Sequence, residues 1–353
     1  MTTATLRRTM RAAVLRGEAG SGLLAIEDVP VPEPGPGEVR VRLLRSGICG
    51  SDVHFVLDGR ARPAFTPIIL GHESMGLIDQ VGVDVDTLAT GDRVSVFPLL
   101  TCGECARCRA GRSVICTQRL CLGSDIDGTF ADYAVVPARN VVPVPDDVPD
   151  AVAAVATDSV ATAYHAVATR GGVRPGSRVA FWGTGGLGLS GVAIARALGA
   201  DRIVAVDPRP EARAWALESG ADEAYDPDGA LDRISGSGGV DVSFEFVGSQ
   251  RTVEQAVRSL DDGGRAVVVG VGPDQISAGR LMTFVLRERE LVGSYGSEPD
   301  DLREVLDLVQ SRRLRLPRLV GDVIPLAEIL DGMRRVEAGD TGGSRIVVAI
   351  AEA

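Results

Sequence analysis

Residues 178–188 read RVAFWGTGGLG, a short apolar strand followed by a glycine-rich turn. Gly183, Gly185 and Gly188 have the spacing G-x-G-x-x-G, and residues 189–200 after them are helical in composition. In such a unit the first glycine makes the tight turn, the second admits a pyrophosphate, and the third lets the helix pack on the strand. The helix N-terminus then faces the phosphates. The stretch predicts a dinucleotide-binding loop rather than a glycine turn without a ligand.

An acidic residue follows this loop at the separation that is typical of a dinucleotide site. Asp207 lies nineteen residues after Gly188, at the end of the apolar strand RIVAVD. A carboxylate there accepts a hydrogen bond from the ribose 2′-OH and repels a 2′-phosphate, so NAD is expected rather than NADP. Arg209 and Arg213 are close enough in sequence to accommodate a phosphate, which leaves NADP as an alternative.

The pattern of expected secondary structure changes near residue 158. Residues 1–157 contain short strands and Pro- and Gly-rich turns, with 1–9 as a tail before a first strand near Met10–Leu15. From 158 to 294, near-continuous apolar strands alternate with helices, which is typical of a parallel sheet covered on both faces. Residues 295–353 hold one amphipathic helix and a terminal strand. We therefore expect an α/β protein, with a doubly wound parallel domain inserted in a β-rich one.

Composition excludes several classes of function. The chain has 353 residues, enough for two domains, and a net charge of −11 that disfavours nucleic acid as a partner. It contains no lysine, because all 37 basic residues are arginine. Schiff-base chemistry, a P-loop lysine and a Tyr–Lys hydride-transfer pair are therefore excluded. No uninterrupted apolar run is long enough to span a membrane, so a membrane is not an expected partner.

Four of the six cysteines crowd into fifteen residues with the spacing C-x2-C-x2-C-x7-C. They are Cys102, Cys105, Cys108 and Cys116. Four thiolates at these spacings predict one tetrahedral Zn²⁺ with no open position, which is a structural site. An iron–sulfur cluster is the second interpretation and disulfides are the third. Cys121 lies outside the spacing and is expected to be a buried thiol. Reduced cysteines favour a cytoplasmic location.

A second set of metal-ligating residue types is spread over three motifs. Cys49 lies in GICGSDVH, His72 in GHES, and Asp158 in TDSVATAYH at the junction of the two domains. A thiolate, an imidazole and a carboxylate can hold zinc with one position left open, as catalysis requires. His165 is seven residues after Asp158 and would share a helix face with it. Its role, in the cleft or in packing, stays open.

These motifs occur in an order that resembles the zinc-dependent members of the medium-chain dehydrogenase/reductase superfamily, the alcohol and polyol dehydrogenases. The resemblance covers essentially the full length, from GICGSDVH and GHE through the four-Cys segment and GTGGLG to the terminal GGSRIVVAI. It implies a Rossmann NAD-binding domain, residues 158–294, inserted in a GroES-like catalytic domain, residues 1–157 plus 295–353. The structural zinc lobe is expected at about 98–121.

The resemblance also implies residue roles. Cys49, His72 and Asp158 would hold the catalytic zinc, with Glu73 next to it, either behind the ligands or as a ligand that exchanges with one of them. Ser51 and His54 match a catalytic proton relay. The implied cofactor contacts are Thr162, Gly183, Gly185, Gly186, Leu187, Gly188, Asp207, Val269 and Arg345, of which the arginine would meet the cofactor phosphates. Many members carry Cys or Glu where this chain has Asp158, and some use an arginine where it has Gly50.

The expected reaction is hydride transfer between a primary or secondary alcohol and NAD, giving an aldehyde or a ketone, with two zinc ions per chain. Zinc in an open site lowers the pKa of a bound hydroxyl group. A polyol, cyclitol or sugar-alcohol dehydrogenase of the same fold is the alternative, and a non-catalytic NAD-binding protein is the alternative from another class. The expected partners are a small alcohol or ketone and other copies of the chain, as a homodimer or homotetramer.

Overall fold

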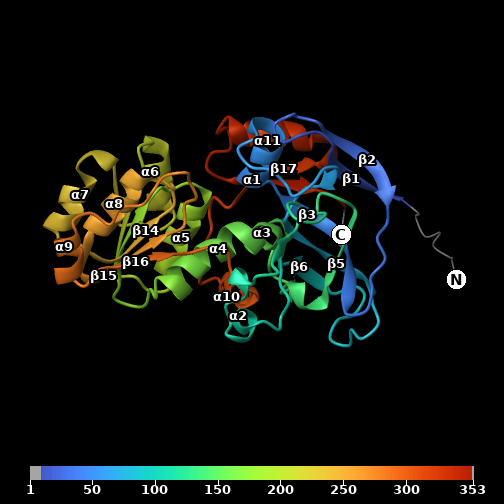
Figure 1. The fold of residues 1–353 in the computed structure, drawn as a ribbon, viewed down its shortest axis with the longest axis horizontal. Coiled ribbons are helices and arrows are strands. Elements are labelled where there is room, and N and C mark those ends of the chain that lie inside the picture. The colour runs from blue at the N-terminus through green and yellow to red at the C-terminus, as the bar shows by residue number, and fades with distance from the viewer. Residues whose placement is uncertain (1–8, 352–353) are drawn as a thin grey trace. The chain divides into compact units, whose positions relative to one another are not determined.

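The computed structural model describes residues 9–351, so most of the expected N-terminal tail, residues 1–9, lies outside the described residues. The chain divides into two compact units (Figure 1). Unit 1 comprises Met1–Asp158, Glu298–Leu306 and Val320–Ala353, and unit 2 comprises Ser159–Ser297 and Asp307–Leu319. Each unit has its own hydrophobic core.

Unit 2 is built on a six-stranded, all-parallel sheet of order β13-β12-β11-β14-β15-β16. The strands are β11 (Arg178–Trp182), β12 (Arg202–Val206), β13 (Glu223–Tyr225), β14 (Val240–Glu245), β15 (Leu260–Val268) and β16 (Glu290–Gly293). The central strands are apolar along their length because both faces of the sheet are covered. Phe181, Trp182 and Phe244 are among the largest fully buried side chains. The doubly wound parallel sheet predicted from the sequence is confirmed.

Helices connect successive strands of this sheet and surround it (Figure 1). The connecting helices are α5 (Gly186–Ala197), α6 (Pro210–Glu218), α7 (Pro227–Gly236), α8 (Gln250–Arg258) and α9 (Leu281–Leu286), while α4 (Ala161–Tyr164) precedes β11. The strand order runs from β11 outward in both directions, so right-handed crossovers place α5 and α6 on one face and α8 on the other. The strand order reverses at β11, where the glycine loop begins. This is the position at which open parallel sheets bind ligands.

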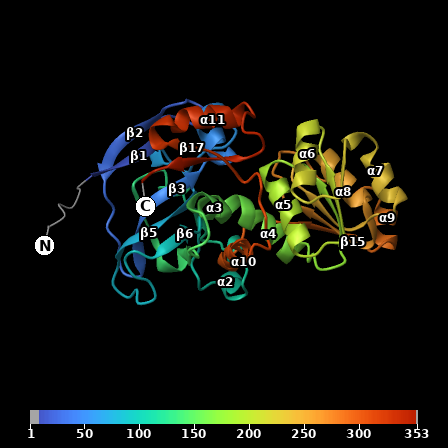
Figure 2. The same cartoon turned by 180° about the vertical axis from the view of Figure 1, so that it is seen from behind.

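Unit 1 is rich in β-strands. Its larger sheet has the order β10-β6-β5-β3-β18-β17, with β9 also paired to β3. The strands are β3 (Glu38–Gly47), β5 (Glu73–Val81), β6 (Arg93–Val96), β9 (Tyr133–Pro137), β10 (Val141–Pro143), β17 (Val320–Pro325) and β18 (Arg345–Ala349). The smaller sheets comprise β2 (Leu24–Pro30), β1 (Thr9–Leu15) and β4 (Ile68–Ile69), and β7 (Leu99–Leu100) with β8 (Leu120–Cys121). The β-rich domain predicted from the sequence is confirmed, with the C-terminal strands β17 and β18 completing its sheet (Figure 2).

Strand pairing brings distant segments to one end of the larger sheet. Gly47, the last residue of β3, lies opposite Glu73, the first residue of β5. β18 also pairs antiparallel with β3, with Val347 opposite Gly47 and the N–H of Ile48 bonded to the carbonyl of Ile346 at 2.9 Å. Continuing this register places Arg345 beside residue 49.

Short helices complete unit 1. They are α1 (Gly50–Val53), α2 (Ala106–Arg109), α3 (Asp150–Val155) and α11 (Ile329–Glu337), while α10 (Pro299–Gln310) has residues in both units. α3 continues into a π-helical turn, η4 (Ala156–Val160), and α1 continues into another, η1 (His54–Asp58). Within residues 9–351 no helix has the length and apolar character needed to cross a bilayer.

Candidate metal and cofactor sites

The four clustered cysteines converge in space as their spacing predicts. Their sulfur atoms are separated by 3.5 Å (Cys105–Cys108), 3.6 Å (Cys102–Cys116), 3.9 Å (Cys102–Cys108) and 4.0 Å (Cys105–Cys116). A tetrahedral ZnS₄ site with Zn–S bonds of about 2.3 Å has sulfur–sulfur edges of roughly 3.8 Å. The described cysteines are free, so the disulfide alternative is wrong. The geometry fits a single tetrahedral metal ion.

Backbone N–H groups point at these sulfurs. Cys105 caps α2, and its Sγ accepts from the N–H of Cys108 at 3.5 Å, while Cys116 Sγ accepts from Gln118 at 3.3 Å. The bond from the N–H of Cys108 is the largest of the hydrogen bonds that lower the pKa of Cys105 to about 6. The lobe is tied to the start of α10, because Glu298 accepts from the hydroxyl of Ser113 and, at 2.9 Å, from the N–H of Val114. The pKa values of Cys105 and Cys116 are lowered, whereas burial and the neighbouring sulfurs raise that of Cys108 to about 11, so a metal ion is needed for all four to be thiolates.

Cys49, His72, Glu73 and Asp158 form the second cluster. One ligand atom from each lies within 4.8 Å of all the others. Asp158 Oδ2 is 3.6 Å from Cys49 Sγ and 3.9 Å from His72 Nε2. A tetrahedral zinc with one sulfur, one nitrogen and one oxygen ligand has edges of roughly 3.3–3.6 Å, so small adjustments would complete the shell. The structure thus brings together residues from three separate motifs.

The electrostatics of this cluster favour a cation. Burial alone would lower the pKa of His72, but the carboxylate of Asp52, the thiol of Cys49 and Asp158 raise it well above its usual value. Glu73 is fully buried, and its carboxylate accepts no well-aligned hydrogen bond, although Arg345 Nη2 lies 3.0 Å from Oε1. Burial raises the pKa of Glu73 to about 7, against the opposing effect of Arg345. A bound metal ion would compensate these buried acceptors, so the donor set fits zinc.

Gly47 makes room for the buried carboxylate. A Cβ at this position would lie 2.4 Å from Glu73 Oε2, closer than real Cβ contacts allow. Any side chain at residue 47 would therefore displace Glu73 from the cluster. The strand end at β3 is thus glycine for a steric reason.

Arg345 lies within this cluster in the structure. Its Nη2 atom is 3.0 Å from Glu73 Oε1 and 3.9 Å from Cys49 Sγ, and its side chain is only 14% exposed. Burial would lower the pKa of Arg345, but the negative groups of Glu73 and Cys49 raise it further. The sequence predicted a contact with cofactor phosphates and gave no sign of this ion pair. The arginine balances the negative charge of Glu73.

Sequence reasoning missed Asp52. This fully buried carboxylate accepts from the N–H of Cys49 through Oδ2 at 2.9 Å, and its Oδ1 lies 3.7 Å from His72 Nδ1. The side chain of Asp52 thereby holds the backbone of the metal ligand Cys49 and faces the ring of the metal ligand His72. The available signal was its position as the third residue of a helix that begins after Cys49, where an acid completes a capping box. Carboxylates in this relation to a ligating histidine orient the ring.

We expect Asp52→Asn to weaken zinc binding at this cluster by about 10- to 100-fold, because the ring of His72 loses its charged partner. Competition of the purified protein with a colorimetric chelator measures the affinity directly. Asp86→Asn, at an exposed position, makes the same charge change and should leave the affinity unaltered. Equal affinities in the two variants would show that Asp52 serves the helix cap alone.

The two predicted relay residues lie on the helical turn after Cys49. Ser51 is the second residue of α1, and His54 begins η1. His54 Nδ1 is 2.9 Å from Asp58 Oδ2, and the histidine side chain is 38% exposed. The ring is therefore held at one nitrogen and is accessible to solvent. This geometry permits proton transfer to water.

The glycine loop has the conformation that its pattern predicts. Gly183 has φ +90°, which favours glycine, and a Cβ at Gly188 would lie 2.1 Å from the carbonyl oxygen of Gly183. Gly185 precedes the first turn of α5, where the free N–H groups of a helix attract phosphate. The remaining predicted residues of the loop, Gly186 and Leu187, begin that helix.

Asp207 directly follows strand β12 and is almost completely buried. Its Oδ2 accepts from the N–H of Thr184 at 2.9 Å, and its two oxygens accept from Arg209 Nε at 3.0 Å and Nη2 at 3.1 Å. Burial raises the pKa of Asp207, but these donors, Arg209 first, lower it below its usual value overall. The aspartate is ionised and already paired with the arginine that follows it.

The other predicted residues are buried near the ends of their elements. Thr162 lies in α4, and Val269 follows β15 and donates its N–H to the carbonyl of Glu245 at 2.8 Å. His165 is buried at the start of the π-helical segment η5 (His165–Arg170). Cys121 is half-buried, and burial raises the pKa of its thiol to about 11. Cys121 is therefore a neutral thiol.

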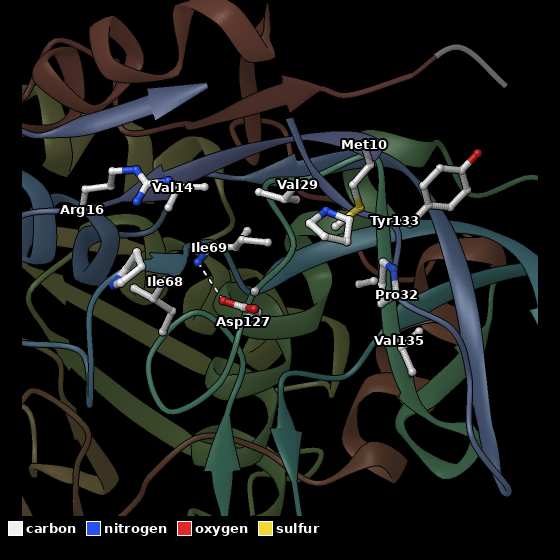
Figure 3. A pocket seen from close by; sticks show the side chains of 14 residues that line it. Met10, Val14, Arg16, Val29, Pro32, Ile68, Ile69, Asp127, Tyr133 and Val135 are labelled. Carbon is white, nitrogen blue, oxygen red and sulfur yellow. Dashed lines mark hydrogen bonds between the residues drawn. The ribbon is translucent and has the colours of Figure 1, made fainter. Parts of the chain in front are cut away.

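A separate cavity of about 330 Å³ opens in unit 1 and contains none of the predicted site residues (Figure 3). Apolar side chains line most of it, including Met10, Val14 and Ile69. Asp127 also lines it, but one of its oxygens accepts from the N–H of Ile69 at 2.9 Å. Neither of the two groups of possible metal ligands among residues 9–351 lies in its lining.

Two protein-family models match the chain. The alcohol dehydrogenase GroES-like domain matches residues 35–146, and the zinc-binding dehydrogenase model matches residues 186–311. Both cover segments that carry the motifs described above.

Full-length relatives agree with these matches. The chain is 32% identical over 337 residues to an L-threonine 3-dehydrogenase of Anaeromyxobacter sp. (strain Fw109-5), covering 94% of this chain and 97% of that one. The crystal structure of AibC has a TM-score of 0.90 at 35% identity, covering 100% of this chain and 99% of that one. That of an NAD-dependent alcohol dehydrogenase has a TM-score of 0.87 at 30% identity, covering 97% and 100%.

Proposed function

The chain belongs to the zinc-binding dehydrogenases of the medium-chain dehydrogenase/reductase superfamily, and from this premise we propose that it oxidises a small alcohol with NAD. Zinc and a nicotinamide dinucleotide are its cofactors. The observation that carries the proposal is the convergence of Cys49, His72, Glu73 and Asp158, whose ligand atoms all lie within 4.8 Å of one another. A non-catalytic protein has no need to retain such a cluster of buried, charged ligand groups.

The protein's own residues divide the work of catalysis. Cys49, His72 and Asp158 would hold the metal and leave one position open for substrate. Zinc bound there would act as a Lewis acid that lowers the pKa of the substrate hydroxyl group, and NAD would accept the hydride. Because Cys49 and Asp158 are both anionic ligands, they would moderate the charge of the metal. Arg345 holds Glu73 by an ion pair of 3.0 Å.

We assign the release of the substrate proton to Ser51 and His54. Ser51, on the first turn after the ligand Cys49, would accept the hydroxyl proton. His54 would pass it to solvent, which its exposed ring permits. A bond between His54 Nδ1 and Asp58 would leave Nε2 as the nitrogen that accepts the proton.

Secondary alcohols are the proposed substrate class, with primary alcohols as the other possibility. The relative named L-threonine 3-dehydrogenase acts, by its name, on a secondary hydroxyl group. A polyol or sugar-alcohol dehydrogenase of the same fold is the competing candidate, since the same zinc ligands serve both reactions. The chemistry of the pocket walls would discriminate them, because a site built to bind hydroxyl groups rejects analogues that lack them.

The test combines metal content with a screen for alcohol-dependent NAD reduction. We expect about two zinc ions per chain, one for each cluster, and NADH formation with secondary alcohols. The screen includes primary, aromatic and polyol alcohols, so the preferred class emerges from one experiment. One zinc per chain together with no turnover of any alcohol would refute the proposal.

We also propose the domain roles that the sequence predicted. Residues 1–157 and 295–353 would form the catalytic domain, with the structural zinc lobe at about 98–121, and 158–294 would form the NAD-binding domain, with which Asp307–Leu319 packs as part of unit 2. The pyrophosphate would be bound by Gly183, Gly185, Gly186, Leu187 and Gly188. Asp207 would bind the ribose. Thr162, Val269 and Arg345 complete the proposed cofactor contacts. A cytoplasmic location is proposed with them, because metal-binding thiolates require reducing conditions.

We infer self-association through unit 2, as a homodimer or homotetramer. Leu281, Met282, Val285 and Leu286 of α9 are exposed, which is unusual for four large apolar side chains on one short helix. β16 is an edge strand of the parallel sheet, with backbone groups free for pairing. A two-fold partner would cover both features at once. Sedimentation equilibrium should give a mass of two or four chains, and Leu281→Asp with Leu286→Asp should reduce it.

A further inference from the structure

The carboxylate of Asp207 has no free acceptor position in this structure. Oδ1 accepts from the backbone N–H and the Nε of Arg209, both at 3.0 Å. Oδ2 accepts from the N–H of Thr184 at 2.9 Å, its hydroxyl at 3.3 Å and Arg209 Nη2 at 3.1 Å. A carboxylate offers about four acceptor sites, so these donors saturate it. A ribose hydroxyl can reach Asp207 only after the guanidinium of Arg209 moves away.

Arg209 is placed to make that movement. It is the residue before α6, and its side chain is 50% exposed although its partner is buried. The pairing uses Nε and Nη2, and Nη1 has no hydrogen-bond partner among the described residues 9–351. The guanidinium therefore presents a free donor edge to solvent. When the side chain leaves, the backbone bonds from Thr184 and Arg209 keep the carboxylate in place.

Arg213 is not available for the same task. Its Nη1 donates to the carbonyl oxygens of Asp207 and Pro208, at 2.8 and 2.9 Å, and contacts Asp226 at 3.2 Å. These bonds hold Arg213 to the backbone of the loop between β12 and α6. Of the two arginines near Asp207, Arg209 alone combines an exposed guanidinium with the ion pair, within residues 9–351.

The ion pair changes the charge that a cofactor meets. An isolated aspartate would repel a 2′-phosphate, which is the usual reason for a preference for NAD. Paired with Arg209, the carboxylate has its charge compensated, and the arginine supplies the planar donor edge that phosphate groups bind. Asp207 and Arg209 can thus bind either a ribose 2′-OH or a 2′-phosphate, depending on the position of the Arg209 side chain.

Resting on the proposed dehydrogenase function, we propose that Arg209 gives this chain dual cofactor specificity, so that it binds NADP as well as NAD. With the guanidinium over Asp207, the aspartate is masked and Nη1 donates to a 2′-phosphate. With the guanidinium swung out, Asp207 accepts from a ribose 2′-OH. Arg209 is therefore a residue that determines cofactor specificity, and Asp207 considered by itself would predict NAD only.

The test uses cofactor fragments that carry no nicotinamide, so that its readout is binding and not turnover. Calorimetric titration of the zinc-loaded full chain with 5′-AMP and with adenosine 2′,5′-bisphosphate compares ribose hydroxyl with 2′-phosphate. We expect the two dissociation constants of the natural chain to lie within about tenfold. Arg209→Ala should weaken the bisphosphate by about 10- to 100-fold, as expected for one charge-assisted contact. It should leave 5′-AMP binding unchanged or tighter, because Asp207 is released.

Opposite responses of the two ligands separate this proposal from general damage. Arg174→Ala removes an exposed arginine before the amino end of β11, away from the carboxyl ends of the strands, and should change neither constant. Discrimination of more than 100-fold against the bisphosphate in the natural chain would overturn the proposal, as would equal weakening of both ligands in Arg209→Ala. If the fragments behave as expected but no alcohol is oxidised, the dehydrogenase function fails and the binding inference stands.

Discussion

Replacing Asp158 by alanine will lower kcat/KM for alcohol oxidation by at least about 10³-fold, equivalent to about 4 kcal/mol of transition-state stabilisation. The zinc content should fall at the same time from about two ions to about one per chain. Asp158 Oδ2 lies 3.6 Å from the sulfur of Cys49 and 3.9 Å from Nε2 of His72, so its loss leaves the three-ligand site with two. The measurements are steady-state NADH formation and metal analysis by mass spectrometry.

Two further variants control this experiment. Asp158→Cys should keep about two zinc ions, because a thiolate is also a ligand that zinc prefers. Asp146→Ala removes an exposed acid and should change neither zinc content nor turnover. If Asp158→Ala keeps both ions and its activity, Glu73 rather than Asp158 completes the site, since Glu73 is the other carboxylate in the cluster.

The sequence predicted the fold well where local patterns carry the information. The spacing of Gly183, Gly185 and Gly188 encodes a positive φ and a close backbone approach, and the structure has both. Apolar strands alternating with helices encode a covered parallel sheet, which is confirmed. The four cysteines could be assigned to one metal because their spacing is local and the sulfur geometry follows from it.

Long-range pairing explains what the sequence did not predict. The ion pair of Arg345 with Glu73 depends on β18 pairing with β3, which joins segments about 300 residues apart. No periodicity reports which strand a C-terminal segment will join. The contact of Asp52 with His72 was missed because an acid in the first turn of a helix is explained equally well by helix capping. Arg209 was noted as an alternative phosphate ligand, but its pairing with Asp207 depends on side-chain geometry that no pattern encodes.

The four-cysteine lobe has little besides its metal to hold it. Its two helices, α2 and η2 (Ser113–Ile115), have four and three residues, and α2 contains no buried residue. Isolated helices of this length are not stable in water. Its buried apolar residues are few, Leu99, Val114 and Cys116; the two-residue strands β7 and β8 pair within it, and Glu298 ties it to α10. Metal binding therefore supplies much of the free energy that folds the lobe, as it does in small zinc domains.

Replacing Cys105 by serine should consequently remove one zinc ion and lower the melting temperature by roughly 10 °C, as a loss of about 3 kcal/mol would do in a domain of this size. Thermal unfolding followed by circular dichroism measures the shift. Cys121→Ser is the matched control, because Cys121 lies outside the cluster, and it should keep both ions. The catalytic ligands remain in Cys105→Ser, so turnover measured well below its melting temperature should persist. Unchanged zinc content and stability would mean that the lobe folds on its apolar contacts and Glu298 alone.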